Sequence, residues 1–403
     1  MRHITHDTAG PSLHIGIAGA GLLGRLAAWT LARQGHRVEV FDPAADEHPR
    51  HDGHGAAGFT AAGMLSPLAE RENADAALAD LGWTSMVLWA QVCAELTHER
   101  PLHGTPHQPT QVPLMQQAGS LLVAHGSDLG AARRVLARLD EPALGTARRR
   151  SMALHTGAHA PSPQALSADA LRALEPALHS SGGPLHAWYL AGEAHIDTVR
   201  TLMALHRQAP QVQWHWGQRV VGVSAGALQT VAAADKARAT PHTCRFELVF
   251  DLRGTGARPD CEVRGVRGEL VWLHAPGLGL QRPVRLLHPR HRVYIVPRAD
   301  DRVLVGASEI ESEDRSPMSL RSAVELMAAA HSVLPGLAEA RILKLDVNLR
   351  PALPHHQPLL QVDDGLVRIN GLYRHGWLLA PALLDQALHR LGLLPTRQAL
   401  AHV

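Results

Sequence analysis

A glycine-rich turn near the start of the chain constrains the fold more than any other feature. In IAGAGLLGRLAAWTLARQGHRVEVFD, three glycines at G-x-G-x-x-G spacing follow an apolar run and precede a periodic apolar segment. This order predicts a strand, a tight turn and a helix from about Leu22 to Gln34. A second predicted strand, HRVEVFD, ends in the acid Asp42. Together these elements form the first βαβ unit of a doubly wound parallel sheet.

Each glycine of the turn has a physical role in binding a dinucleotide. Gly19 permits the tight turn, Gly21 lets the backbone approach a pyrophosphate, and Gly24 lets the helix pack against its strand. The helix N-terminus then offers free N–H groups and the positive end of its dipole to the anion.

An acid at the end of the second predicted strand suits the ribose of such a ligand. Asp42 stands 23 positions after Gly19, where a carboxylate accepts hydrogen bonds from ribose hydroxyls and disfavours the 2′-phosphate of NADP. Glu39 is the alternative acid, but it lies inside the strand. The residues alone leave the choice between NAD and FAD open.

Composition excludes several other classes of protein. The 403 residues predict two domains, and the net charge of +2, without an aromatic-rich basic stripe, argues against a nucleic-acid partner. No apolar run is long enough to span a membrane, and the polar N-terminus is unlike a signal peptide, so we expect a soluble protein with no membrane partner.

Cysteine and histidine usage bears on location and on metal binding. Cys93, Cys244 and Cys261 lie far apart without a C-x-x-C pair, which favours a reduced, cytoplasmic setting. The 28 histidines include no H-E-x-x-H or comparable ligand pattern, so we predict no metal site.

Periodicity along the rest of the chain predicts first a mixture of helices and strands and then a set of antiparallel strands. Helices are expected over 74–97, 167–178, 197–208 and 319–334, with short strands between them. From GVRGELVWLHA to HRVYIVPRADDRVLVGAS the alternation is typical of antiparallel strands, with a turn at 299–301. The chain closes with a strand, a glycine turn and a terminal helix.

Four further segments carry a resemblance to a known family. AAGFTAAGMLSPLAE, from Ala56 to Glu70, resembles the second flavin-contacting segment of the D-amino-acid oxidase superfamily, and most closely that of glycine oxidases of the thiamine-pathway type. RVYIVPRADDRVLVGAS, NLRPALP and GLYRHGWLLAP are similar to later motifs of the same family, in the same order. With the glycine turn they cover nearly the whole chain.

The resemblance implies an α/β fold in which a Rossmann-like FAD-binding domain holds an inserted antiparallel-sheet substrate domain. The FAD-binding domain is expected over 1–75, 155–258 and 345–403, and the substrate domain over 76–154 and 259–344. The implied cofactor is FAD.

The resemblance also assigns the residues that bind FAD. Leu22 and Leu23 would lie at the pyrophosphate, Asp42 and Pro43 at the adenosine ribose, and Val220 at the adenine through its backbone. Ala57 and Gly58 would lie on the approach to the flavin, and Ala62, Gly63 and Met64 would line its ring. The pyrimidine end of the flavin would be contacted by Leu372, Tyr373, Arg374, His375, Gly376, Trp377 and Leu378. The helix that starts near Trp377 would direct its positive end there and favour the reduced flavin.

For the substrate, the resemblance implies a carboxylate clamp at Arg350, a hydroxyl partner at Tyr294 and a second cation at Arg374. A guanidinium suits a carboxylate because its planar fork donates two parallel hydrogen bonds. The implied reaction moves a hydride from the Cα of a small amino acid or amine to flavin N5 and gives an imine. Dioxygen then reoxidises the flavin to yield hydrogen peroxide, and thiamine (thiazole) biosynthesis is the implied pathway.

Two alternatives stay open at this point. The enzyme could pass its electrons to a quinone or a protein instead of dioxygen, or the chain could be a catalytically silent flavoprotein subunit. Five positions near the expected pocket, Asn348, Ala352, Leu353, Leu372 and His375, depart from the usual glycine oxidase motifs and leave the substrate open. The oligomeric state is also open, and a homo-oligomer is compatible with the sequence.

Overall fold

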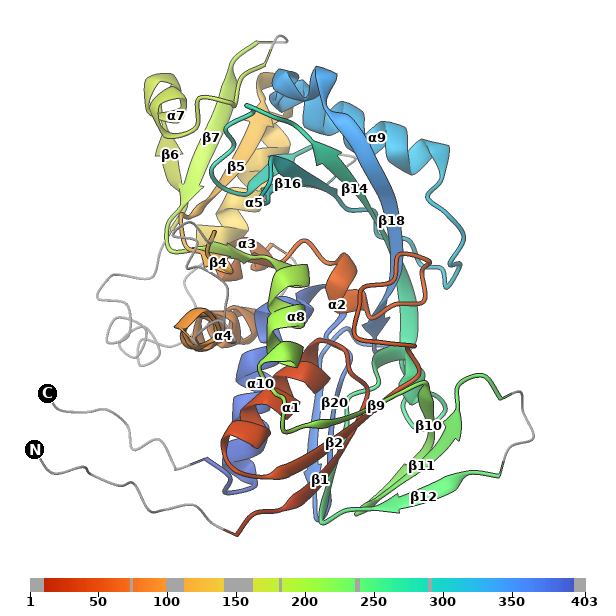
Figure 1. Ribbon diagram of the computed structural model, residues 1–403. Coiled ribbons are helices and arrows are strands. Elements are labelled where there is room, and N and C mark those ends of the chain that lie inside the picture. Colours follow the sequence, from red (N-terminus) through yellow and green to blue (C-terminus); the bar gives the residue numbers. More distant parts are fainter. Residues whose placement is uncertain are drawn as a thin grey trace, which may run out of the picture.

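Two large sheets organise the molecule (Figure 1). The computed structural model describes residues 11–72, 75–98, 112–140, 162–180, 183–235, 240–288 and 292–394. A six-stranded sheet with helices beside it forms the lower part in the view of Figure 1, and an eight-stranded sheet forms the upper part.

The six-stranded sheet confirms the predicted βαβ start. Its order is β19-β20-β13-β1-β2-β9, and every neighbouring pair is parallel except β19 with β20. Helix α1 (Leu22–Arg33) connects β1 to β2, which lie side by side in this sheet. The strands are β1 (His14–Ala18), β2 (Arg37–Asp42), β9 (Gln213–Trp216), β13 (Leu248–Asp251), β19 (Leu359–Asp363) and β20 (Leu366–Asn370).

Long helices cover this sheet because their apolar faces share one core. They are α1, α4 (Ala76–His98), α8 (Thr198–Arg207) and α10 (Gly376–Arg390). Trp89 of α4 is fully buried, and its Nε1–H donates to the Trp377 carbonyl at 2.7 Å. This bond ties α4 to the first turn of α10.

The eight-stranded sheet has two faces with different surroundings. Alternate residues such as Val271, Ile295 and Val305 pack under α9 (Leu320–Val333). The side chain of Tyr294, which is paired with Gly306, lies on the opposite face. Its order is β18-β14-β17-β16-β15-β5-β7-β6. The strands are β5 (Ser120–His125), β6 (Gln164–Leu166), β7 (Leu185–Leu190), β14 (Arg264–His274), β15 (Val284–Leu287), β16 (Arg292–Pro297), β17 (Arg302–Gly306) and β18 (Arg341–Ala352).

Smaller elements complete the described part of the chain. One three-stranded sheet contains β10 (Gln218–Ser224), β11 (Ala227–Ala232) and β12 (His242–Arg245), and another contains β3 (Met64–Leu65), β8 (Ala194–Ile196) and β4 (Met115–Gln116). The shorter helices are α2 (Ala57–Thr60), α3 (Pro67–Glu70), α5 (Leu129–Asp140) and α7 (Ala168–Leu174), with 3₁₀ turns at Gly126–Asp128, Gly254–Ala257, Pro335–Glu339 and Tyr373–His375.

The expected division into domains stays a prediction. Three elements pack with a different sheet from the one that their expected domain would place them in. Helix α4, which we expected in the substrate domain, packs in the core of the six-stranded sheet. Strands β6 and β7, which we expected in the FAD-binding domain, belong to the eight-stranded sheet. Periodicity identifies an element but not the layer against which it packs.

Within the described ranges, no helix is long and apolar enough to cross a membrane. The same residues contain no group of three or more His, Cys, Asp or Glu side chains arranged to hold a metal ion. The three cysteines are free, and Cys93 is buried.

Acidification should destabilise the protein through His195, which is 4% exposed in β8. Burial, reinforced by the charge of Arg298, lowers the pKa of this imidazole from 6.5 to about 3. The unfolded chain therefore binds the extra proton between those values, and stability falls as the pH drops below 6.5. Urea unfolding at pH 7 and pH 5 should show a loss of up to about 2 kcal/mol from this group. His195→Gln should shrink the pH dependence by that amount, and an unchanged dependence would contradict the assignment.

Candidate functional site

A cavity of about 730 Å³ extends from the carboxyl ends of the parallel strands to the open face of the eight-stranded sheet. Its lining includes the segments that follow β1, β2, β13 and β20. The carboxyl edge of an open parallel sheet is where nucleotides bind in doubly wound folds.

The glycine turn forms one wall of this cavity, and its geometry agrees with the predicted turn at Gly19 and the predicted close packing at Gly24. Gly19 has a φ of +98°, and a Cβ on Gly24 would overlap the Gly19 carbonyl oxygen. Gly21 caps α1 without a side-chain hydrogen bond, so the first N–H groups of α1, at Leu22 and Leu23, stay available for an anion. Gly24 itself lies behind the turn, between helix and strand.

Asp42 braces the turn and also lines the cavity beside Pro43. Its Oδ2 accepts the Ala20 N–H at 2.7 Å and its Oδ1 accepts the Ala44 N–H at 2.8 Å. Glu39, the alternative acid, instead pairs with His14 at 2.9 Å and His215 at 3.0 Å. The geometry therefore favours Asp42 as the acid next to a bound ribose.

The segment from Ala57 to Met64 brings main chain close to the cavity. Ala57, Gly58, Ala62, Gly63 and Met64 all line it. Gly63 has a φ of +64°, and a Cβ there would overlap the Ile196 carbonyl oxygen. Only glycine fits this position without moving β8.

The closing segment meets the cavity along most of its length. Leu372, Tyr373, Arg374, Gly376 and Trp377 line it, and the Trp377 Nε1–H donates to the Gly58 carbonyl at 3.0 Å. His375 is turned away toward Glu70, with 3.3 Å between His375 Nδ1 and Glu70 Oε2. Leu378 lies in the core, in contact with Gly82.

Val220 lines the opposite end of the cavity, where we expect the adenine. Its carbonyl accepts a hydrogen bond from Arg253 Nη1 at 3.3 Å. Arg253 is in turn ion-paired with Asp251 at 2.7 Å, so the backbone at this end is fixed by a buried charge pair.

Two glycines make room for the predicted substrate residues on the open face of the eight-stranded sheet. Tyr294 of β16 is aligned with Gly306 of β17, and a Cβ on Gly306 would lie 2.9 Å from the Tyr294 ring. A Cβ on Gly268 of β14 would overlap the guanidinium of Arg350, which extends from β18. Tyr294 and Arg350 therefore meet over strands that carry no side chain there.

Arg350 is held by backbone carbonyls rather than by an acid. Its Nη1 and Nη2 both donate to the Ser308 carbonyl at 3.1 Å, and Nη1 also donates to the Arg267 carbonyl at 3.3 Å. Among the described residues no carboxylate forms an ion pair with it. Burial raises the pKa of the Tyr294 hydroxyl, which the charge of Arg350 partly offsets, so Tyr294 stays a hydrogen-bond donor at neutral pH.

The other two arginines at this end are neutralised by acids. Arg285 donates to Glu70 at 2.7 Å, and Arg374 lies 3.4 Å from both Glu70 and Glu309. Burial alone would raise the pKa of Glu70, but these cations outweigh it and lower the pKa to about 2. Glu309 also accepts the Tyr373 hydroxyl at 2.6 Å.

Sequence reasoning missed Arg285, Glu70 and Glu309 as site residues, although all three line the cavity. Glu70 closes the Ala56–Glu70 segment that carries the family resemblance, so its position offered a signal. Arg285 lies opposite Tyr294 in the register of β15 and β16, which becomes visible only after the strands are paired.

Comparison with known proteins agrees with this geometry. The family profile described as FAD dependent oxidoreductase matches residues 14–384. The chain belongs to this family of FAD-dependent oxidoreductases. A Rhizobium etli protein named putative thiamine biosynthesis oxidoreductase ThiO is 34% identical over 94% of this chain and 96% of its own length. A Bacillus licheniformis glycine oxidase is 27% identical over 54% of this chain and 59% of its own length.

Solved structures of this family share the fold. The glycine oxidase from Geobacillus kaustophilus has a TM-score of 0.73 and 22% identity, covering 97% of this chain and 98% of that one. The glycine oxidase from Bacillus cereus has a TM-score of 0.72 and 21% identity, covering 95% of this chain and 96% of that one. This chain therefore has the fold of these two glycine oxidases.

The residues present fit the FAD that the family requires. The uncapped N-terminus of α1 and the acid Asp42 suit a pyrophosphate and a ribose. The main chain of Ala62, Gly63 and Met64 lines the part of the cavity where the flavin would lie. The cavity passes from these groups to Tyr294 and Arg350 without interruption.

Gly24→Ala should weaken FAD binding because the new methyl group would push the Gly19 carbonyl out of the turn. Overpacking of this kind costs about 1–3 kcal/mol, which corresponds to a roughly 5- to 150-fold weaker affinity. Flavin content after purification and the FAD dissociation constant of the refilled apoprotein measure the effect. Gly130→Ala on α5 is the matched control, because a Cβ there has no neighbour within 4 Å. Equal FAD affinity in both variants would contradict the packing role of Gly24.

Proposed function

We propose that this flavoenzyme oxidises a small amino acid or amine that carries a single carboxylate. The observation behind the proposal is the charge balance at the substrate end of the cavity. Glu70 and Glu309 neutralise two arginines there, while Arg350 is bonded to backbone carbonyl oxygens. A largely buried cation without an acid partner is the group that gains most from an anionic ligand.

The side chains of this end would bind and orient the substrate. The Ser308 and Arg267 carbonyls accept hydrogen bonds from the terminal nitrogens of Arg350, and the Tyr294 hydroxyl interacts with the same guanidinium. A carboxylate would bind the edge formed by Nε and the second Nη2 hydrogen, next to this hydroxyl. The protonated Tyr294 hydroxyl would donate to the same carboxylate. Holding the acid group in this way fixes the direction of the adjacent Cα–H bond. Bound FAD supplies the two-electron acceptor for the hydride, and the product is an imine.

We propose dioxygen as the final electron acceptor, with hydrogen peroxide as its product, and a quinone or protein acceptor as the alternative. The names of the relatives, a thiamine biosynthesis oxidoreductase and glycine oxidases, support a role in making the thiazole part of thiamine. The free cysteines support a cytoplasmic location.

Anaerobic titration of the purified yellow protein tests this function. Glycine, sarcosine and small D-amino acids would be added while the flavin absorbance is followed, and peroxide would be measured after air is admitted. At least one of these compounds should bleach the flavin and produce peroxide. A flavin that none of them bleaches would support the silent-subunit alternative, and bleaching without peroxide would support the dehydrogenase.

Arg350→Ala should remove the carboxylate clamp and leave FAD bound. Breaking a buried charge pair costs about 2–5 kcal/mol, so kcat/KM for the amino acid should fall roughly 30- to 5000-fold. Steady-state kinetics and flavin content measure the two effects. Arg321→Ala is the matched control, because its side chain is 85% exposed on α9. An unchanged Michaelis constant in Arg350→Ala would contradict the clamp.

A further inference from the structure

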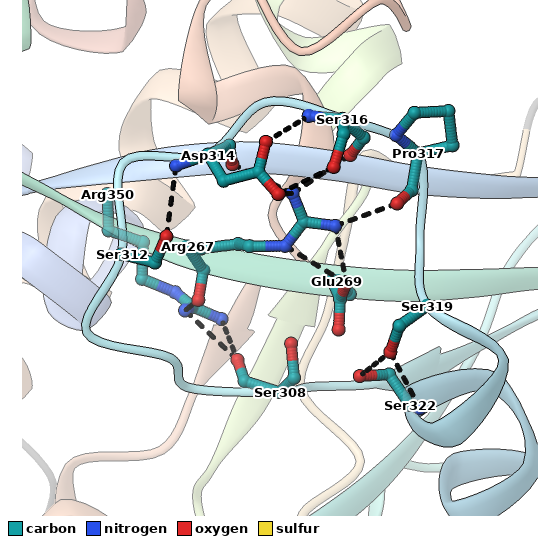
Figure 2. Close-up of polar contacts among 10 residues, drawn as sticks. All are labelled: Arg267, Glu269, Ser308, Ser312, Asp314, Ser316, Pro317, Ser319, Ser322 and Arg350. Carbon is teal, nitrogen blue, oxygen red and sulfur yellow. Dashed lines mark hydrogen bonds and ion pairs between the residues drawn. The ribbon is translucent and has the colours of Figure 1, made fainter.

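The side chain of Arg267 in β14 makes many hydrogen bonds outside the lining of the cavity, although its carbonyl accepts a bond from Arg350 (Figure 2). The residue is 4% exposed, and its Nε and Nη2 donate to Glu269 at 3.1 and 2.7 Å. Its remaining N–H groups donate to the carbonyls of Asp314 and Ser316 at 2.8 Å and of Pro317 at 2.9 Å. All three carbonyls belong to residues 307–319, the segment between β17 and α9, which we call the strap.

The backbone of Arg267 also pairs with the strap. Its N–H donates to the carbonyls of Ile310 at 3.0 Å and Ser312 at 3.1 Å, and its carbonyl accepts the Ile310 N–H at 3.0 Å. The guanidinium and the peptide group thus hold the strap at both of its ends. A lysine could not do this, because a single ammonium cannot reach three carbonyls and an acid in one plane.

The strap reaches the substrate end of the cavity through its first two polar residues. The Ser308 carbonyl accepts hydrogen bonds from both terminal nitrogens of Arg350, and Figure 2 shows this contact beside the hydrogen bonds of Arg267. Glu309 accepts the Tyr373 hydroxyl and pairs with Arg374. The position of the strap therefore sets the orientation of Arg350 and part of the charge balance around Arg374.

We propose that Arg267 is a positioning residue that sets the affinity of the enzyme for the substrate carboxylate. The inference rests on the proposed function, in which Arg350 binds that carboxylate. With the strap in place the Ser308 carbonyl holds the Arg350 guanidinium in one orientation. Without it the guanidinium has to be ordered when the ligand binds, and that ordering reduces affinity.

Arg267→Lys tests the proposal, because it keeps a positive charge opposite Glu269 and removes the guanidinium bonds to the carbonyls of Asp314, Ser316 and Pro317. The probe is acetate, a carboxylate without an amine, titrated into oxidised holoenzyme while the flavin spectrum is followed. We expect the dissociation constant of acetate to rise about tenfold or more, the equivalent of about 1.4 kcal/mol. The Michaelis constant of the substrate should rise in parallel, while kcat and flavin content stay near those of the wild type.

Arg264→Lys is the matched control. Arg264 lies on the same strand and pairs with Glu311 of the same strap at 3.0 Å, but Glu311 is 62% exposed. Exposed pairs contribute about 0–1 kcal/mol, so acetate affinity should change by less than about fivefold. A wild-type acetate affinity in Arg267→Lys, or equal losses in both variants, would overturn the proposal.

Hydrogen exchange of the wild-type holoenzyme tests the same coupling if Arg267→Lys does not fold. Because coupling between two sites is reciprocal, acetate must then stabilise the strap, and the amides of Ile310 and Ser312 should exchange more slowly with acetate bound. Unchanged exchange at saturating acetate would overturn the proposal. A wild-type flavin that responds neither to acetate nor to any amino acid would refute the proposed function itself.

Discussion

The substrate end of the cavity depends on two positions where the eight-stranded sheet carries no side chain. Gly306 leaves space for the ring of Tyr294, and Gly268 leaves space for the guanidinium of Arg350. Neighbouring strands in a sheet are about 4.8 Å apart, so side chains from β16 and β18 meet only where the strands between them are bare. Because of these two gaps, Tyr294 and Arg350 both line the cavity on the open face of the sheet.

Charge is distributed around that surface in an asymmetric way. Glu70 holds Arg285 and Arg374 from one side, and Glu309 holds Arg374 from the other. Carbonyl dipoles stabilise Arg350 without cancelling its charge, which keeps the guanidinium ordered and still attractive to an anion. One such cation favours a substrate with one carboxylate and gives little to a second acid group.

Local sequence was sufficient to predict the elements around the glycine turn. The glycine spacing predicted β1, α1 and β2 because Gly19 and Gly24 answer local steric needs, and alternation predicted the antiparallel strands β14, β16 and β17. Asp42 could be predicted because its place at the end of β2 is visible in local sequence.

The charge network at the substrate end could not be predicted from local sequence. Glu70 and Arg285 are 215 positions apart and meet only when β15 joins the sheet. Arg267 gave no signal either, because an arginine in an apolar strand does not reveal that a distant loop folds over it. Such pairs arise from tertiary packing, so a motif could name Arg350 but not the carbonyl that orients it.

A crystal structure of the holoenzyme with acetate bound would test the account most directly. We predict both acetate oxygens within about 3 Å of Arg350, on the edge formed by Nε and Nη2, with the Tyr294 hydroxyl as a further donor. The Ser308 carbonyl should keep its bonds to Nη1 and Nη2 of Arg350. Acetate bound to Arg285 or Arg374, with Arg350 pointing away from the ligand, would contradict the account.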